Sequence, residues 1–274
     1  MIIDAQVHFW KANSPERPWV PNRVAQLPEP FTAEKFVPMM DEAGVERAVI
    51  VPPSWEGDRN DCALEAVARH PGRFAVMGRI PVQGPKTAAL LPDWKKQPGM
   101  VGIRLTFHPH QWSWLTDGTA DWFWSAAEKY GLPVMFYGAP MPSFAPIAEH
   151  HPQLQMIADH LGVTGDVAKS PRLAEAIGET AALAKYPNVS VKLSTTPFYS
   201  AESYPFRDMT VHIRRLFDAF GPRRCYWGTD LTNSYNKASY KQRVTHFTET
   251  LDFLSAEDKR WIMGDAIRAR LGWA

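Results

Sequence analysis

The chain has few of the features that mark disulfide-stabilised, nucleic-acid-binding or membrane-spanning proteins. Only two of its 274 residues are cysteines, Cys62 and Cys225, and they lie too far apart to form a CxxC motif. The formal net charge is +1, so there is no excess of Lys and Arg for binding nucleic acid or an anionic membrane. No apolar run is long enough to span a bilayer. We therefore expect a small molecule as the binding partner.

Nothing in the sequence divides the chain into separate domains. It contains no charge run, low-complexity tract or Gly/Ser linker, and its 45% hydrophobic residues suffice for one large core. We expect a single domain over residues 1–274. The first residues lack the basic and long apolar regions of a secretory signal, which predicts a cytoplasmic protein. Whether it is a monomer or a homo-oligomer is left open.

Short apolar segments rich in β-branched residues alternate with amphipathic segments along the whole chain. We expect strands at residues 1–10, 45–51, 74–79, 100–107, 132–137, 154–160, 189–194 and 225–230. Helical periodicity is found at residues 32–43, 120–130, 173–186, 210–220 and 240–254. Eight repeats of a strand followed by a helix, at a spacing of about thirty residues, are typical of a (β/α)8 TIM barrel. A doubly wound open sheet is the alternative fold.

The positions of polar residues favour the closed barrel. At or just beyond the C-terminal ends of the expected strands lie Gln6, His8, Arg104, Tyr137, His160, Lys192, Ser194 and Asp230. A barrel brings these strand ends together at one mouth, where the active sites of such barrels lie. In an open sheet the first and last strands do not need to meet. The sequence therefore predicts one shared site at the barrel mouth.

Four motifs resemble the amidohydrolase superfamily, specifically its amidohydrolase-2 branch. They are Ile3–His8, Ile157–Gly162, Tyr226–Asp230 and Ile262–Leu271, and together they extend over almost the whole chain. This branch includes 2-pyrone-4,6-dicarboxylate lactonases, related lactone hydrolases and nonoxidative decarboxylases. The resemblance implies a TIM barrel with its active site at the C-terminal ends of the strands.

The chain departs from the family pattern at two positions that matter for metal binding. Gln6 stands where the family usually has the first His of a His-x-His motif, and the fifth strand ends in Tyr137 rather than in a metal ligand. The resemblance leaves His8, His160 and Asp230 as ligands for at most one zinc or manganese ion. Because an amide oxygen is a weaker ligand than imidazole, we expect no cofactor.

Without a metal, the reaction needs an activated substrate. A catalytic metal lowers the pKa of its bound water from about 15.7 to about 7, which is worth roughly 12 kcal/mol. A lactone with a good leaving oxygen is far easier to open than an amide, and the resemblance likewise implies a metal-free lactonase. We therefore predict a hydrolase that opens a carboxylated lactone. Asp230 would be the general base, and His8, His160 and Gln6 would polarise the carbonyl and stabilise the oxyanion.

Arg104 points to an anionic, cyclic substrate. It faces inward if Ile103 and Leu105 face outward, and a buried guanidinium requires an anion. That anion is either a substrate carboxylate, bound by the guanidinium fork, or an internal partner such as Asp159 or Asp230. Further substrate-binding residues are expected to be Tyr137, Lys192, Ser194, Trp112 and Trp55.

Other reactions stay open. An inward Arg, an acid on the eighth strand and histidines would also serve a metal-dependent nonoxidative decarboxylase of an aromatic or unsaturated acid, or a metal-dependent amidohydrolase. A non-catalytic binding barrel is the least favoured alternative. Ser194 has neither an adjacent base nor a Gly-x-Ser-x-Gly elbow, which argues against a serine hydrolase triad.

Overall fold

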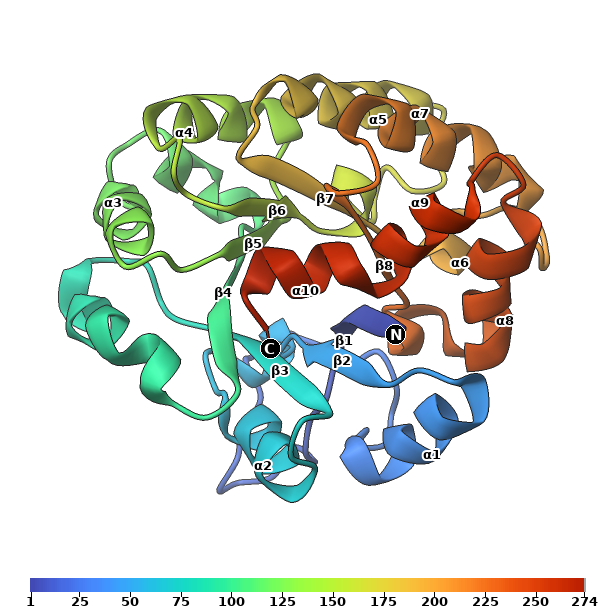
Figure 1. The fold of residues 1–274 in the computed structure, drawn as a ribbon. Helices are drawn as coiled ribbons and strands as arrows, with labels where there is room; N and C mark the ends of the chain where they lie inside the picture. The colour runs from blue at the N-terminus through green and yellow to red at the C-terminus, as the bar shows by residue number, and fades with distance from the viewer. Residues whose placement is uncertain (274) are drawn as a thin grey trace.

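A computed structural model describes residues 1–273 and contains one parallel sheet of eight strands in sequential order, surrounded by helices (Figure 1). The strands are β1 Ile3–Val7, β2 Arg47–Ile50, β3 Phe74–Gly78, β4 Met100–Thr106, β5 Val134–Tyr137, β6 Met156–Ala158, β7 Val189–Ser194 and β8 Cys225–Gly228. Each lies within the range expected from the sequence. The expected (β/α)8 barrel is confirmed, and only Ala274 of the expected domain lies outside the described residues.

The first and last strands meet, so the open-sheet alternative is wrong. Beyond the end of β8, the Asp230 N–H donates to the carbonyl of Gln6 at 2.9 Å. The Asp4 carboxylate on β1 accepts from the Thr229 N–H at 2.8 Å, from the Thr229 hydroxyl at 2.6 Å and from the Tyr240 hydroxyl at 3.0 Å. Despite these hydrogen bonds, complete burial raises the pKa of Asp4 to about 6.

Ten α-helices lie within the described residues. They are α1 Ala33–Ala43, α2 Asp61–Arg69, α3 Asp121–Lys129, α4 Ala145–His150, α5 Leu173–Ala182, α6 Thr196–Tyr199, α7 Thr210–Phe220, α8 Tyr240–Thr245, α9 Ala256–Arg260 and α10 Ala266–Leu271. Gly44 ends α1 in the left-handed conformation, at a φ of 72°, as its position after the helical pattern predicts. The helix expected over 240–254 changes to a π-helical turn at His246–Thr250. None of these helices combines the length and apolar character needed to cross a membrane.

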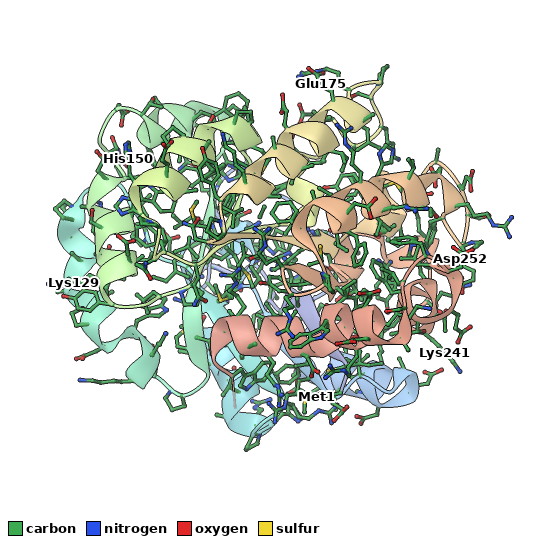
Figure 2. All side chains as sticks on the ribbon, turned by 45° about the horizontal axis from the view of Figure 1, so that its top comes forward. Met1, Lys129, His150, Glu175, Lys241 and Asp252 are labelled. Carbon is green, nitrogen blue, oxygen red and sulfur yellow. The ribbon has the colours of Figure 1, made fainter. Side chains whose placement is uncertain are left out.

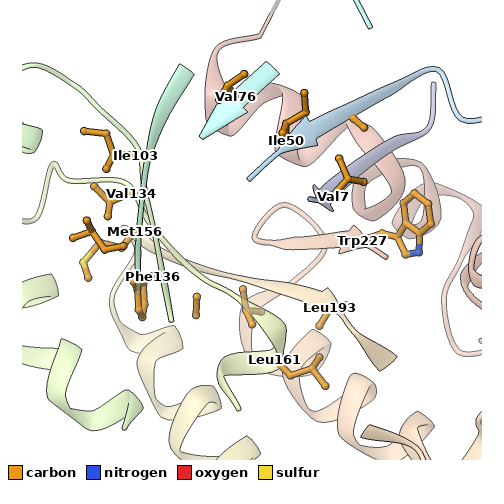
Figure 3. Close-up of a cluster of buried hydrophobic side chains, with 14 of the residues drawn as sticks. Val7, Ile50, Val76, Ile103, Val134, Phe136, Met156, Leu161, Leu193 and Trp227 are labelled. Carbon is orange, nitrogen blue, oxygen red and sulfur yellow. The ribbon is translucent and has the colours of Figure 1, made fainter. Parts of the chain in front are cut away.

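Neighbouring side chains lie on opposite faces of most strands, and the pairing register shifts once between β1 and β2 and once between β3 and β4. On β5, Val134 and Phe136 face outward into the layer between sheet and helices, while Met135 faces the barrel interior. Figure 3 shows the outward layer, in which residues from all eight strands, such as Val7, Ile103 and Leu193, line up beneath the helices. Figure 2 shows how densely side chains fill this space.

The end of the barrel at the N-termini of the strands is apolar and covered. The apolar cluster inside the barrel consists of Ile3, Ala5, Val49, Val51, Met77, Met135, Ile157 and Tyr226, and it is continued by Ala266, Ile267 and Leu271 of α10. Figure 1 shows α10 lying across this opening. Because this end is closed, ligands can reach the interior only from the C-terminal ends of the strands.

Candidate active site

Three strands end in a non-glycine residue in the left-handed conformation. His160 follows β6 with a φ of 54°, Thr195 follows β7 with 68° and Asp230 follows β8 with 46°. Non-glycine residues in this conformation are strained and cluster at functional sites. The three turns direct these side chains toward one point at the barrel mouth.

Asp230 is the carboxylate at the centre of this cluster. Its Oδ1 lies 3.2 Å from His8 Nε2, and its Oδ2 accepts from the Thr195 hydroxyl at 3.1 Å and lies 3.8 Å from His160 Nδ1. Burial raises the pKa of Asp230, but the charge that His160 takes up in acid, the charge of His8 and the hydrogen bonds from His8 and Thr195 outweigh it. The net result is a pKa of Asp230 well below its usual range. The carboxylate is therefore ionised at neutral pH.

The ring of His8 is fixed on both sides. Its Nδ1 lies 2.5 Å from the carbonyl oxygen of Val51, which only accepts, so Nδ1 bears a proton. Its Nε2 lies 3.3 Å from Gln6 Nε2, and the Gln6 amide cannot flip because Lys192 Nζ donates to Gln6 Oε1 at 2.5 Å. His8 Nε2 thus faces a donor, Gln6, and an acceptor, Asp230. It can accept from the amide when neutral and donate to the carboxylate when protonated.

His160 is held as a neutral imidazole. Its Nδ1 lies 2.6 Å from Thr195 Oγ1 and 3.0 Å from Ser194 Oγ, and burial lowers the pKa of His160 to about 4. The ring of Tyr137 meets it edge-on, with 5.0 Å between centroids. Ser194 and Asp230 both face Nδ1, whereas a Ser-His-Asp triad places them on opposite ring nitrogens. The geometry therefore agrees with the expectation that this is no serine hydrolase triad.

A layer of paired charges lies beneath the histidines. Asp159 bridges Lys192 Nζ at 2.9 Å and Arg104 Nε at 3.2 Å, and both Asp159 and Lys192 are completely buried. Arg104 faces inward, as expected, and its internal salt bridge is formed with Asp159. Arg104 Nη1 also donates to Thr106 Oγ1 at 2.5 Å. Lys192, which could have reached solvent at a strand end, is instead part of the barrel interior.

The side chains of this cluster open into a cavity of about 190 Å³. The expected site residues that line it are His8, Trp55, Arg104, Tyr137, His160 and Asp230. Gln6 and Ser194 lie behind this wall and contact the lining residues His8 and His160, and Lys192 lies farther back, in contact with Gln6. Trp112 is absent from the described cavity wall, and its indole N–H donates to the carbonyl of Gly138 at 2.8 Å. Tyr199 and Asn233 also line the cavity and carried no signal in the sequence.

The donors in this arrangement do not fit a metal centre. Within residues 1–273, no three His, Cys, Asp or Glu side chains are arranged so that they could hold a metal ion. The oxygen of Gln6 is occupied by the Lys192 ammonium, and Nδ1 of His160 is turned toward two hydroxyls. A fixed ammonium also disfavours a second cation nearby. The expectation of no cofactor, with zinc or manganese as the alternative, stays a prediction.

Comparisons with known proteins agree with this architecture. The amidohydrolase family model matches residues 3–273. The chain is 26% identical over 241 residues to an L-fucono-1,5-lactonase of Burkholderia ambifaria, covering 83% of this chain and 79% of that protein. It is 29% identical over 238 residues to a 4-sulfomuconolactone hydrolase of Hydrogenophaga intermedia, covering 83% and 74%.

Solved structures show the same fold. An amidohydrolase of Burkholderia multivorans with bound zinc superposes with a TM-score of 0.83 at 19% identity, covering 99% of each chain. A probable 2-pyrone-4,6-dicarboxylic acid hydrolase of Acinetobacter baumannii does so with a TM-score of 0.79, again at 19% identity and 99% of each chain. With the family model matched from β1 to α10, the motif resemblance is confirmed, and the chain is a hydrolase that belongs to the amidohydrolase family.

Proposed function

We propose that this protein opens a carboxylated lactone, with Asp230 as the general base. The observation that supports it most directly is the ionised Asp230 carboxylate, held between His8 and Thr195 at the wall of the cavity. Both curated relatives described above are named for lactone substrates, which supports the same class of reaction here. The flat walls formed by Trp55 and Tyr137 suit a small ring.

The reaction follows from the position of the carboxylate. Asp230 takes a proton from a water molecule as the water oxygen bonds to the lactone carbonyl carbon. The bond between that carbon and the ring oxygen then breaks, and Asp230 returns the proton to the leaving oxygen. The product is a hydroxy acid. His8 lies 3.2 Å from Asp230 and is positioned to donate to the developing oxyanion when protonated.

Gln6 and Lys192 act through His8 in this proposal. Because Lys192 binds the oxygen of Gln6, the amide directs its NH2 group toward His8 Nε2. Gln6 is therefore a positioning residue for His8. The same arrangement supports a metal-free reaction, since it places an ammonium and an amide NH2 group, rather than ligands, beside the imidazole.

The test is a panel of carboxylated lactones assayed for ring opening by the wild type and by Asp230→Asn. Loss of the base should lower kcat by about 10²- to 10⁴-fold. Asp218→Asn on α7 is the matched control, because that side chain is 62% exposed and is not among the described residues that line the cavity, and its kcat should not change. Unaltered turnover by Asp230→Asn would show that another group is the base.

Two measurements separate the alternative reactions. Metal analysis of protein purified without chelators should find much less than one zinc or manganese per chain. A stoichiometric ion, lost on substitution of His8 or His160, would instead support the metal-dependent alternatives. Release of carbon dioxide from aromatic or unsaturated acids, with no ring opening of lactones, would identify the decarboxylase.

A further inference from the structure

A second, larger cavity adjoins the first at the barrel mouth. Its volume is about 430 Å³, and it shares Ser54, Arg104, Thr106 and His108 with the smaller cavity. The two cavities are thus neighbouring compartments of one mouth. The larger one contains neither His8 nor Asp230 in its described wall. It is lined by cationic and titratable side chains, namely Arg23, Arg79, Arg104, His108 and His110, with Asp58 as the acid.

Arg79 is the buried cation of this compartment. It follows β3 directly and faces inward, because Phe74 and Val76 face outward. The Asn60 amide holds its backbone from both sides, accepting from the Arg79 N–H at 2.7 Å and donating to the Arg79 carbonyl at 3.0 Å. Only 9% of Arg79 is exposed. Its guanidinium is therefore placed firmly at the floor of the larger cavity.

The charge of Arg79 is poorly compensated. Its Nε donates no hydrogen bond to any described residue, and its ion-pair contact with Asp58 Oδ1 is 3.9 Å long, to a carboxylate that is 44% exposed. Arg104, by comparison, is paired with the fully buried Asp159. Burial and then the neighbouring charge of Arg104 lower the pKa of Arg79 to about 9, which still leaves it cationic at neutral pH. A buried cation in this state is costly unless an anion reaches it.

Thr106 stands between the two guanidiniums. Its Oγ1 accepts from Arg79 Nη1 at 3.1 Å and from Arg104 Nη1 at 2.5 Å. With both acceptor positions taken, the hydroxyl proton remains for donation to a third group. Thr106 belongs to the wall of both cavities. Two guanidiniums and a hydroxyl donor therefore converge at the boundary between the compartments.

We propose that Arg79 and Thr106 form an anion subsite for an acidic substituent of the substrate, a carboxylate or a sulfonate, while the lactone ring occupies the cavity beside Asp230. This inference rests on the proposed function for the lactone itself. The guanidinium of Arg79 binds two oxyanion oxygens, and Thr106 donates to one of them. The subsite makes the enzyme selective for acidic over neutral lactones.

Binding of inorganic sulfate tests the subsite without any substrate. Titration calorimetry at low ionic strength should show sulfate binding to the wild type, with affinity at least about tenfold lower in Arg79→Gln, since hydrogen bonds to charged groups are lost. Arg79→Lys should be intermediate. Arg69→Gln on α2 is the charge-matched control. The Arg69 side chain is 56% exposed and forms an ion pair with Glu34, and this variant should bind sulfate as the wild type does. Absence of binding to the wild type, or equal binding to Arg79→Gln, would overturn the subsite.

Kinetics with paired lactones tests the selectivity. The ratio of kcat/KM for an acidic lactone over its neutral ester should fall about tenfold in Arg79→Gln, mainly through KM, for carboxylate and sulfonate substituents alike. An unchanged ratio would overturn the inference. If Arg79→Gln does not fold, as judged by circular dichroism, Thr106→Val replaces it in both experiments. A wild type that binds sulfate through Arg79 but opens no lactone would refute the proposed function and leave the subsite intact.

Discussion

The two ends of the barrel interior differ in chemistry although they are equally buried. Near the N-termini of the strands, inward residues such as Val49 and Ile157 are apolar and lie beneath α10. At the C-terminal ends, Asp159 and Lys192 are as inaccessible as Ile157, at 0% exposure. The apolar end is stabilised by removal of its surface from water. The polar end requires a partner for each charge, because an unpaired buried charge is far more costly than a cavity.

The polar end is also connected in a way that the apolar end is not. Hydrogen bonds and ion pairs lead from Arg104 through Asp159, Lys192 and Gln6 to His8. Each group is oriented by the next, so the group that faces Nε2 of His8 depends on a lysine that does not touch the ring. Apolar contacts at the other end do not orient one side chain through the next in this way. Substitutions at the two ends should therefore differ in kind as well as in size.

Lys192→Met should give the largest effect. It leaves Asp159 with Arg104 alone and frees the Gln6 amide to rotate, so we expect a loss of about 3–5 kcal/mol in the free energy of unfolding together with a lower kcat. Urea unfolding followed by circular dichroism measures the first quantity. Lys241→Met on α8 removes an exposed charge and is the control.

The double substitution Lys192→Met with Asp159→Asn sharpens this test. It removes the carboxylate that has lost its lysine partner, so part of the lost stability should return, whereas kcat should stay low because Gln6 remains unanchored. Asp159→Asn alone completes the cycle, and losses of the two single variants that simply add up in the double variant would mean that Lys192 and Asp159 are not coupled.

Asp4 should give the next largest effect, as a dependence of stability on pH. Its pKa is raised from 3.8 to about 6, so the folded state keeps its proton to higher pH than the unfolded chain does. The free energy of unfolding should fall as pH rises from about 4 to about 6, by about 3 kcal/mol, and this contribution should stay constant above that range. Asp4→Asn should lack this decrease. Urea midpoints between pH 3.5 and 7.5 measure it, and identical profiles would contradict the assignment.

Thr195→Val should reduce activity more than stability. Valine keeps the β-branched shape in the strained left-handed turn and removes only the hydroxyl that joins His160 to Asp230. A hydrogen bond to a charged group is worth about 1.5–3 kcal/mol, so kcat should fall roughly 10- to 150-fold. Thr195→Ser should recover most of it. In the wild type, kcat/KM should fall as the pH drops through about 4, where His160 becomes protonated. The pH of this fall should shift in Thr195→Val if the hydroxyl holds His160 and Asp230 together.

The sequence predicted which residues face the polar end better than it predicted the contacts between them. Period-two alternation placed Arg104 inward because Ile103 and Leu105 face outward, and polar residues at strand ends marked His160 and Asp230. The same alternation over residues 74–79 also places Arg79 in the mouth. The signal is weak, because β3 contains no polar residue and Arg79 is the first residue after it.

Other contacts had no signal in the sequence. The pairing of Asp159 with Lys192 depends on the register between β6 and β7, and the bridging role of Thr195 depends on a positive φ that a threonine rarely adopts. Trp112 was expected at the mouth because its loop follows β4. A loop has no periodicity that determines where its side chains point, and this indole is bound to the backbone at Gly138 instead.

Ile157→Val should give the smallest effect and completes the contrast between the ends. It removes one methylene group from the fully buried layer beneath α10, so the free energy of unfolding should fall by only about 0.5–1.5 kcal/mol. Because no hydrogen bond connects Ile157 to His8 or Asp230, kcat and its pH dependence should equal those of the wild type. Thermal unfolding and a pH–rate profile measure both quantities. A change in kcat would mean that packing at the closed end also sets the geometry of the mouth, and the two ends would then form one cooperative unit.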